Sequence, residues 1–105
     1  MYTHISVFRF KDREHMETDR VQIREMLLTF PAHIPSIQSC QVLDNCLAQP
    51  NVPADSPLLF CDLVQIITFQ SEADLVAYPQ DPYHRKLVQE TDGLLERVCV
   101  IDYQN

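Results

Sequence analysis

Basic residues are scarce in this sequence. Its 105 residues contain 8 Lys and Arg against 15 Asp and Glu, which gives a formal net charge of −7 at pH 7. Nucleic acids and anionic membrane surfaces both attract proteins that carry a basic face. We therefore expect neither nucleic acid nor a membrane among the partners of this chain.

Long apolar runs are also absent. No stretch approaches the roughly 18 apolar residues of a membrane-spanning helix. The opening "MYTHISVFRFKD" lacks the basic and apolar regions of a secretory signal. Hydrophobic residues still make up 46% of the chain and are spread along it. We therefore expect a cytoplasmic protein with a single globular domain over residues 1–105.

Motifs for metal binding are missing too. The four cysteines form no C-x-x-C pair, and no histidine stands beside them at the spacing of zinc ligands. In a reducing compartment, Cys40, Cys46, Cys61 and Cys99 are expected to act as small core residues. We predict no metal and no cofactor, and haem is disfavoured because no histidine has the pattern of an axial ligand.

The chain shows strand and helix patterns in turn. Alternation, or β-branched and aromatic content, predicts strands over residues 3–10, 36–45, 58–69 and 96–103. Helical spacing of apolar residues predicts a helix over residues 14–30 and another between Ser71 and Gly93. Residues 46–57, which contain three prolines, are predicted to form a long loop.

Prolines interrupt the second predicted helix. Ser71 is a predicted N-cap for its first part, which ends near Pro79. Asp81 is a second predicted N-cap, and Pro82 follows it in the first helical position, where its missing N–H costs nothing. Gly93, the only glycine, is expected just beyond the end of the second part. The break therefore starts a new helix inside this segment.

The order βαββαβ predicts a ferredoxin-like α+β fold. Helices should cover one face of its antiparallel sheet, and the third strand, the most apolar one, is expected at the centre. In the first strand His4, Ser6 and Phe8 should share one face, while Ile5 and Val7 share the other. Because the strands are apolar on both faces, we predict a homodimer that forms through the open sheet face.

Four segments resemble the stress-responsive dimeric α/β-barrel family, in the same order and over nearly the whole chain. They are "THISVFRFKD", "IPSIQSCQVLDN", "DLVQIITFQSEADLVAYPQDPYHRKL" and "VCVIDY". The resemblance implies two ferredoxin-like protomers whose sheets close into a barrel across the dimer.

The resemblance also implies a site. The family includes many proteins known only as stress-responsive, and plant polyketide cyclases of the olivetolic acid cyclase type, which close a poly-β-ketone by an aldol reaction without a cofactor. The working residues of those cyclases match His4, Tyr78 and His84 here. Two departures bear on ligand geometry: Pro79 directly follows the tyrosine, and residues 46–57 form the long proline-rich segment.

Aldol or isomerisation chemistry needs a base near neutral pKa and a donor for the developing enolate oxygen. His84 is the predicted base, because a first-turn position next to the positive end of a helix dipole disfavours the imidazolium. Tyr78 would donate its hydroxyl, and His4 would orient or relay. Further ligand contacts are predicted for Phe8, Lys11 and Tyr83.

Plainer roles exist for the same residues. His84 also fits a satisfied histidine beside a helix cap, Tyr78 a core aromatic, and His4 a strand residue bonded to a backbone carbonyl. The sequence is thus compatible with a cofactor-independent cyclase, isomerase or lyase that acts on a small carbonyl-rich or phenolic compound. The alternative is a non-catalytic dimer that binds a small ligand or serves a structural role in the stress response. Families with the same barrel also include cofactor-free monooxygenases and haem proteins.

Overall fold

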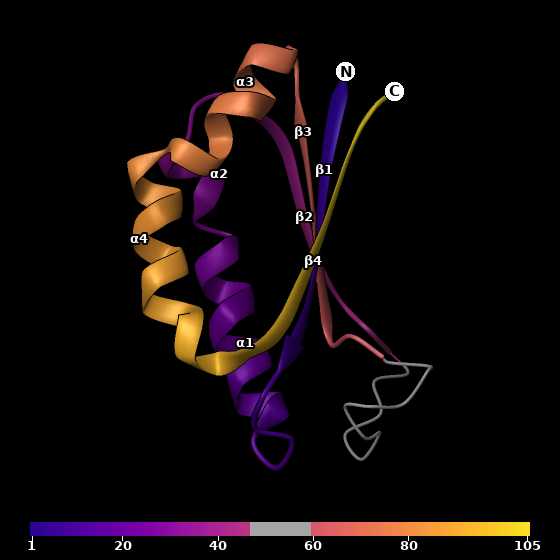
Figure 1. Cartoon of the computed structure of the whole chain (residues 1–105), viewed down its shortest axis with the longest axis vertical. Coiled ribbons are helices and arrows are strands. Elements are labelled where there is room, and N and C mark those ends of the chain that lie inside the picture. Colours follow the sequence, from indigo (N-terminus) through magenta and orange to yellow (C-terminus); the bar gives the residue numbers. More distant parts are fainter. Residues whose placement is uncertain (47–59) are drawn as a thin grey trace.

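The computed structural model describes residues 1–46 and 60–105 of the chain. In these residues four strands form one antiparallel sheet in the order β2-β3-β1-β4. The strands are β1 (Tyr2–Phe10), β2 (Ile37–Asp44), β3 (Leu63–Phe69) and β4 (Leu95–Gln104). The helices α1 (Met16–Leu27), α2 (Phe30–His33), α3 (Glu72–Ala77) and α4 (Pro82–Thr91) cover one face of it (Figure 1). The predicted ferredoxin-like α+β fold is confirmed, and β3 lies inside the sheet.

Alternation along β1 distinguishes the two faces of the sheet. His4, Ser6 and Phe8 are buried beneath the helices, whereas Ile5 and Val7 point to the other face and are half-buried. The prediction for this strand is confirmed. The polar side chains of His4 and Ser6 therefore lie on the face that α4 covers, within reach of residues from that helix.

The hydrophobic core lies between the sheet and the helices. Its buried members are Phe8, Phe10, Met16, Ile23, Leu27, Phe30, Ile34, Ile37, Leu63, Ile67, Phe69, Tyr78 and Leu87. On the opposite sheet face, Leu43, Ile101 and Tyr103 remain 50%, 60% and 44% exposed. Burying apolar surface is favourable by about 25 cal/mol per Å², so this open face has a physical reason to acquire a cover.

The structure corrects the prediction for the second strand. Strict alternation over residues 36–45 places Ile37 and Leu43 on the same face. The ladder between β2 and β3 shifts its register between Ile37 and Ser39. Ile37 therefore turns into the core while Leu43 stays exposed. An irregularity of this kind exchanges the two faces of a strand on either side of it.

The chain between α1 and β2 is more regular than predicted. Helix α1 ends at Leu27, and residues 30–33 form α2 with Pro31 in its first turn. Proline is tolerated there because the first N–H groups of a helix have no partner inside it.

The predicted third strand begins only at Leu63. The predicted proline-rich loop, residues 46–57, lies outside the described residues except for Cys46.

The cysteines are free and differ in exposure. Cys40 packs against the core, but Cys46 and Cys99 are exposed, so their prediction as core residues is wrong. Cys99 pairs with Val7 of β1 and lies with it on the open sheet face. Cys99 and Ile101 are therefore exposed on the same uncovered face of the sheet.

Both predicted caps of the broken helix are confirmed. Ser71 Oγ accepts a hydrogen bond from the backbone N–H of Asp74 at 3.1 Å. Asp81 Oδ1 accepts from the N–H groups of Tyr83 and His84 at 2.8 and 3.4 Å. These side chains satisfy N–H groups that a helix start leaves without partners. The new helix α4 therefore begins at Pro82, as the sequence predicts.

The end of α4 differs from its prediction. The helix stops at Thr91 and continues as a 3₁₀ turn over Asp92–Leu94. Gly93 lies inside this turn, and no residue in the described parts of the chain has a positive φ. The glycine is therefore not a left-handed helix cap.

Candidate functional site

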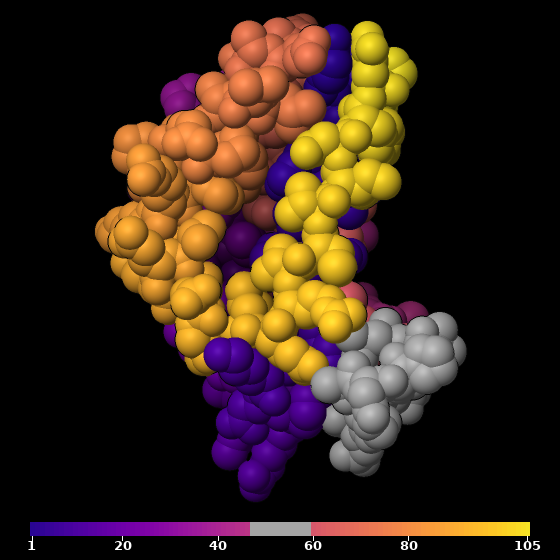
Figure 2. Space-filling view, in the orientation of Figure 1, coloured from indigo at the N-terminus to yellow at the C-terminus, as the bar shows by residue number. Residues whose placement is uncertain are grey.

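A cavity of about 500 Å³ lies between the sheet and the helices. Its surface opening appears as a hollow between α4 and the edge strand β4 (Figure 2). Leu87, Val88 and Thr91 line it from α4, and Val98 and Val100 line it from β4. Most of the wall is apolar, so the few polar side chains that reach it would set the orientation of a ligand.

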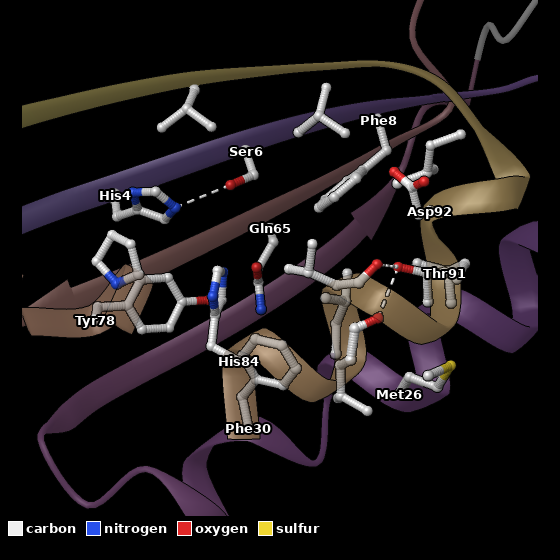
Figure 3. A pocket seen from close by; sticks show the side chains of 18 of the residues that line it. His4, Ser6, Phe8, Met26, Phe30, Gln65, Tyr78, His84, Thr91 and Asp92 are labelled. Carbon is white, nitrogen blue, oxygen red and sulfur yellow. Dashed lines mark hydrogen bonds between the residues drawn. The ribbon is translucent and has the colours of Figure 1, made fainter. Parts of the chain in front are cut away.

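His4, Tyr78 and His84 converge in the wall of this cavity (Figure 3). The Tyr78 ring centroid is 4.5 Å from that of His84 and 5.1 Å from that of His4. The three residues come from β1, from the proline-containing turn and from α4. The break between α3 and α4 therefore brings the tyrosine and the second histidine together beside the first.

His84 lies in the first turn of α4, where Asp81 accepts its backbone N–H. Burial lowers the pKa of its imidazole, and nearby His4 lowers it further, while the Pro79 backbone carbonyl and Asp81 act in the opposite direction. The sequence predicts a lowered pKa from the helix dipole, but desolvation is the largest cause. A neutral ring at physiological pH can accept a proton.

The His84 ring also has a buried nitrogen, Nδ1, without a hydrogen-bond partner among the described residues. Buried polar atoms in folded proteins are rarely left unpaired. A bound polar group would find an unused position here.

Tyr78 is 2% exposed and contacts Phe30 and Phe69 as well as the two histidines. Burial strongly raises the pKa of its phenol. The hydroxyl therefore remains protonated at neutral pH and can act as a donor. Pro79 continues the chain as part of the 3₁₀ turn Tyr78–Gln80 and leaves the tyrosine ring beside His84.

His4 has side-chain partners that the sequence does not predict. Its Nδ1 lies 2.5 Å from Asp102 Oδ1, and its Nε2 lies 3.0 Å from Ser6 Oγ. His4 and Asp102 are directly opposite each other in the ladder between β1 and β4. The plainer prediction of a bond to a backbone carbonyl is replaced by this pair of side-chain bonds.

The other three predicted ligand contacts, Phe8, Lys11 and Tyr83, lie in different places relative to the cavity. Phe8 lines the cavity. Lys11 is exposed in the turn after β1 and is not part of the lining. Tyr83 turns away from the cavity, where its ring stacks on His33 at 4.0 Å and its hydroxyl bonds Thr29 Oγ1. The structure therefore brings one of these three residues to the candidate site.

Several polar lining residues were not predicted as site residues from the sequence, among them Ser6, Gln65 and Asp102. Ser6 and Gln65 are opposite each other in the β1–β3 ladder and are both buried. Polar residues at positions where a strand alternates toward the core are a signal that could have found the first two. In the described parts of the chain no cluster of ligating side chains could hold a metal ion, and no helix is long and apolar enough to cross a membrane.

Known proteins share this architecture. The sequence model of the family described as "Stress responsive A/B Barrel Domain" matches residues 2–105. A dimeric protein of unknown function with a ferredoxin-like fold from Bacteroides fragilis has a TM-score of 0.77 at 20% identity, over 99% of this chain and 95% of its own. A protein from Arabidopsis thaliana has a TM-score of 0.79 at 18% identity, over 100% and 95%.

The similar structures also include enzymes with a stated activity. Hydroxynitrile lyase from Passiflora edulis has a TM-score of 0.74 at 19% identity, over 97% of this chain and 90% of its own. No curated protein matches the sequence significantly. At these identities the structural similarity shows a shared fold, and the activity has to be argued from the site.

Proposed function

Because this chain belongs to the stress-responsive A/B barrel domain family, whose sequence model spans residues 2–105, we propose that it is a cofactor-independent cyclase, isomerase or lyase. Its substrate would be a small carbonyl-rich or phenolic compound bound in the cavity. The observation that carries this proposal is the partly buried His84 ring in the cavity wall, with Nδ1 unpaired among the described residues and Tyr78 at 4.5 Å.

The two side chains have complementary roles in this chemistry. The neutral His84 ring removes a proton from a carbon next to a carbonyl, because burial lowers the pKa of the imidazole. The enolate oxygen then accepts a hydrogen bond from the Tyr78 hydroxyl, which burial keeps protonated. In an aldol closure the enolate carbon attacks a second carbonyl of the same molecule, and the new alkoxide takes the proton back from His84.

His4 completes the polar end of the cavity. It lies beside Tyr78 and is held by Asp102, so its ring orientation is fixed. A fixed imidazole can orient a carbonyl oxygen or relay a proton toward the same substrate. The hydroxynitrile lyase among proteins of this fold supports a lyase as one form of the activity.

The test combines ligand binding with turnover. Phenolic acids, poly-β-ketones and small enolisable acids are screened by thermal shift against the wild type, His84→Gln and a control, His15→Gln. His15 is an exposed histidine outside the cavity lining. A compound that binds only the folded chain raises the melting temperature by mass action. We expect a hit to stabilise the wild type and the control, and to be turned over by both.

Loss of turnover in His84→Gln with an intact fold would support the base role, and full activity in that variant would contradict it. Binding without turnover in all three proteins would indicate a small-ligand-binding module instead. If no compound stabilises the wild type, the structural stress-response dimer becomes the better account, since the exposed apolar sheet face also favours it.

We also propose that the chain forms a homodimer through this open face. Leu43, Ile101 and Tyr103 are at least 44% exposed there. The similar protein from Bacteroides fragilis is described as dimeric. A second copy of the same face is a complementary apolar cover and leaves the helix-side cavity accessible between α4 and β4.

A further inference from the structure

Three side chains at one end of the cavity are connected in the order serine, imidazole, carboxylate. Ser6 Oγ lies 3.0 Å from His4 Nε2, and His4 Nδ1 lies 2.5 Å from Asp102 Oδ1 (Figure 3 shows the first of these bonds). A carboxylate can only accept, so the proton of a neutral His4 ring sits on Nδ1. Nε2 then carries the lone pair and accepts the hydrogen of the Ser6 hydroxyl.

The position of Ser6 suits attack on a bound molecule. Ser6 and His4 are 5% and 7% exposed, and both line the cavity. The β1–β4 ladder sets His4 opposite Asp102, and adjacent pairing of β1 with β3 sets Ser6 opposite Gln65. The arrangement therefore rests on strand register, which fixes side chains more firmly than a loop does.

Gln65 lies opposite Ser6 in the β1–β3 ladder and carries a side-chain amide. Its side chain is 2% exposed, and its Nε2 makes a weak contact of 3.9 Å with Cys40 Sγ. An amide nitrogen carries two N–H groups. One of them can stabilise negative charge on a carbonyl oxygen that Ser6 attacks, as donors of an oxyanion hole do.

We infer that Ser6 is a nucleophile that accepts the acyl group of a small carboxylic ester or thioester. Ser6 Oγ bonds to the carbonyl carbon while its proton moves to His4 Nε2. The bond from that carbon to the leaving oxygen or sulfur breaks, and the leaving group takes the proton from His4. Ile23, Met26 and Leu27 in the cavity wall favour an apolar acyl chain.

Water completes the reaction. It gives a proton to His4 Nε2 as its oxygen attacks the acyl-serine carbonyl, and the bond to Ser6 Oγ breaks. The proton returns to Ser6 Oγ, and a carboxylic acid leaves. Asp102 keeps its hydrogen bond to His4 Nδ1 and acts as a positioning residue that holds the required tautomer of His4. This activity does not require His84 to act as a base.

The test uses p-nitrophenyl butanoate as a substrate and a fluorophosphonate as an irreversible probe of the full chain. We expect the probe to add one phosphonyl group to the peptide that contains Ser6, with loss of fluoride, and Ser6→Ala to abolish both labelling and ester turnover. The control is Ser39→Ala, because Ser39 lies on β2, is exposed and is outside the cavity lining. It should keep the wild-type labelling rate.

Asp102→Asn gives a second measurement if Ser6→Ala does not fold. The fluorophosphonate should label this variant about tenfold more slowly than the wild type, or slower still. The reason is that an amide no longer enforces the Nδ1–H tautomer of His4. Its labelling rate should also show a changed pH profile, which loss of packing alone would not cause. The proposal is overturned if the folded wild type is not labelled or if the adduct lies on a residue other than Ser6. It is also overturned if Ser6→Ala or Asp102→Asn is labelled at the wild-type rate.

Discussion

At the scale of single residues, burial decides the chemistry of His84. The ring lies in the cavity wall, and desolvation lowers the pKa of its imidazole below the ordinary value of 6.5. In the unfolded chain the same ring regains that ordinary value. Between the two pKa values the unfolded chain therefore binds a proton that the folded chain does not bind.

This difference predicts a pH-dependent loss of stability. The contribution of the buried, neutral His84 ring to the free energy of unfolding is fully present above pH 6.5. It declines as the pH falls from 6.5 toward the lower pKa that the ring has in the folded chain. The decline is at most about 1.4 kcal/mol per pH unit for one proton, and smaller here because the ring is partly exposed. Urea unfolding of the wild type and His84→Asn, at several pH values across this window, measures it.

We expect the wild type to lose more stability than His84→Asn on acidification, because asparagine does not titrate. The exposed His15 provides the control: His15→Asn should follow the wild-type curve. Equal pH dependence in the wild type and in His84→Asn would show that burial of this ring does not affect its protonation.

A second prediction concerns Asp62, which is fully buried and accepts hydrogen bonds from Phe10 and Arg13. These come from the Phe10 backbone N–H at 2.9 Å and from Arg13 Nη1 and Nη2 at 2.8 and 2.9 Å. Asp62→Ala removes the acceptor and leaves buried donors behind. We expect it to lower the free energy of unfolding by about 3 kcal/mol, as measured by urea denaturation.

The matched control for that prediction is Asp12→Ala. Asp12 forms an exposed pair with His15 at 2.7 Å, and such surface pairs add little to stability. This variant should unfold close to the wild-type urea midpoint. If both aspartates proved equally dispensable, the ion pair of Asp62 would contribute nothing beyond a surface pair.

Sequence reasoning brought His4, Tyr78 and His84 together because each matches a family position. It could not supply Asp102 as the partner of His4, because those residues are 98 positions apart and meet only through the register of β1 and β4. It also attributed the lowered pKa of His84 to the helix dipole, since burial of one side chain depends on packing that a linear pattern does not contain.

At the scale of elements, the start of α4 positions the candidate base. Asp81 caps this helix through the N–H groups of Tyr83 and His84. Asp81→Ala should lower the free energy of unfolding by about 1 kcal/mol and weaken any ligand bound at His84, as seen by urea denaturation and thermal shift. Asp81→Ser, which restores a capping oxygen, should recover most of both losses.

Removing the cap of α3 shows whether a weaker ligand affinity comes from the start of α4 or from a general loss of stability. Ser71→Ala removes the cap of α3, which is not adjacent to His84. It should reduce stability but preserve ligand affinity. If Asp81→Ala and Ser71→Ala weakened the ligand equally, the cap of α4 would have no special role in placing the histidine.

Elements were predictable where a local rule determines them. Serine and aspartate caps and proline positions identified the break before α4, and both caps are present. The register shift at Ile37 was not predictable, because it depends on which residues of β3 lie opposite. Gly93 failed as a helix cap because the chain leaves α4 through a 3₁₀ turn with ordinary φ.

At the scale of the whole molecule, the open sheet face predicts the oligomeric state. We expect the wild type to sediment with twice the mass of one 12.2 kDa chain. Ile101→Lys places a charge in the proposed interface and should shift the protein to monomers, as measured by sedimentation velocity at several concentrations.

The control for this prediction is Val76→Lys on α3. Val76 is 67% exposed but lies on the helix layer, away from the open face. This variant should remain dimeric, and circular dichroism should show both variants folded. A monomeric wild type, or a dimeric Ile101→Lys variant, would rule out assembly through this face.

Strand β4 lies at the edge of the sheet and alternates between two environments. Asp102 turns toward the cavity, while its neighbours Ile101 and Tyr103 turn toward the open face. A ligand or a second chain that restricts the motion of β4 on one face therefore also restricts the side chains on its other face. If a second chain covers the open face, ligand affinity and subunit affinity become thermodynamically linked, and each must alter the other by the same factor. If the coupling is positive, diluting the protein would weaken ligand binding, and a saturating ligand would shift the monomer–dimer equilibrium toward the dimer.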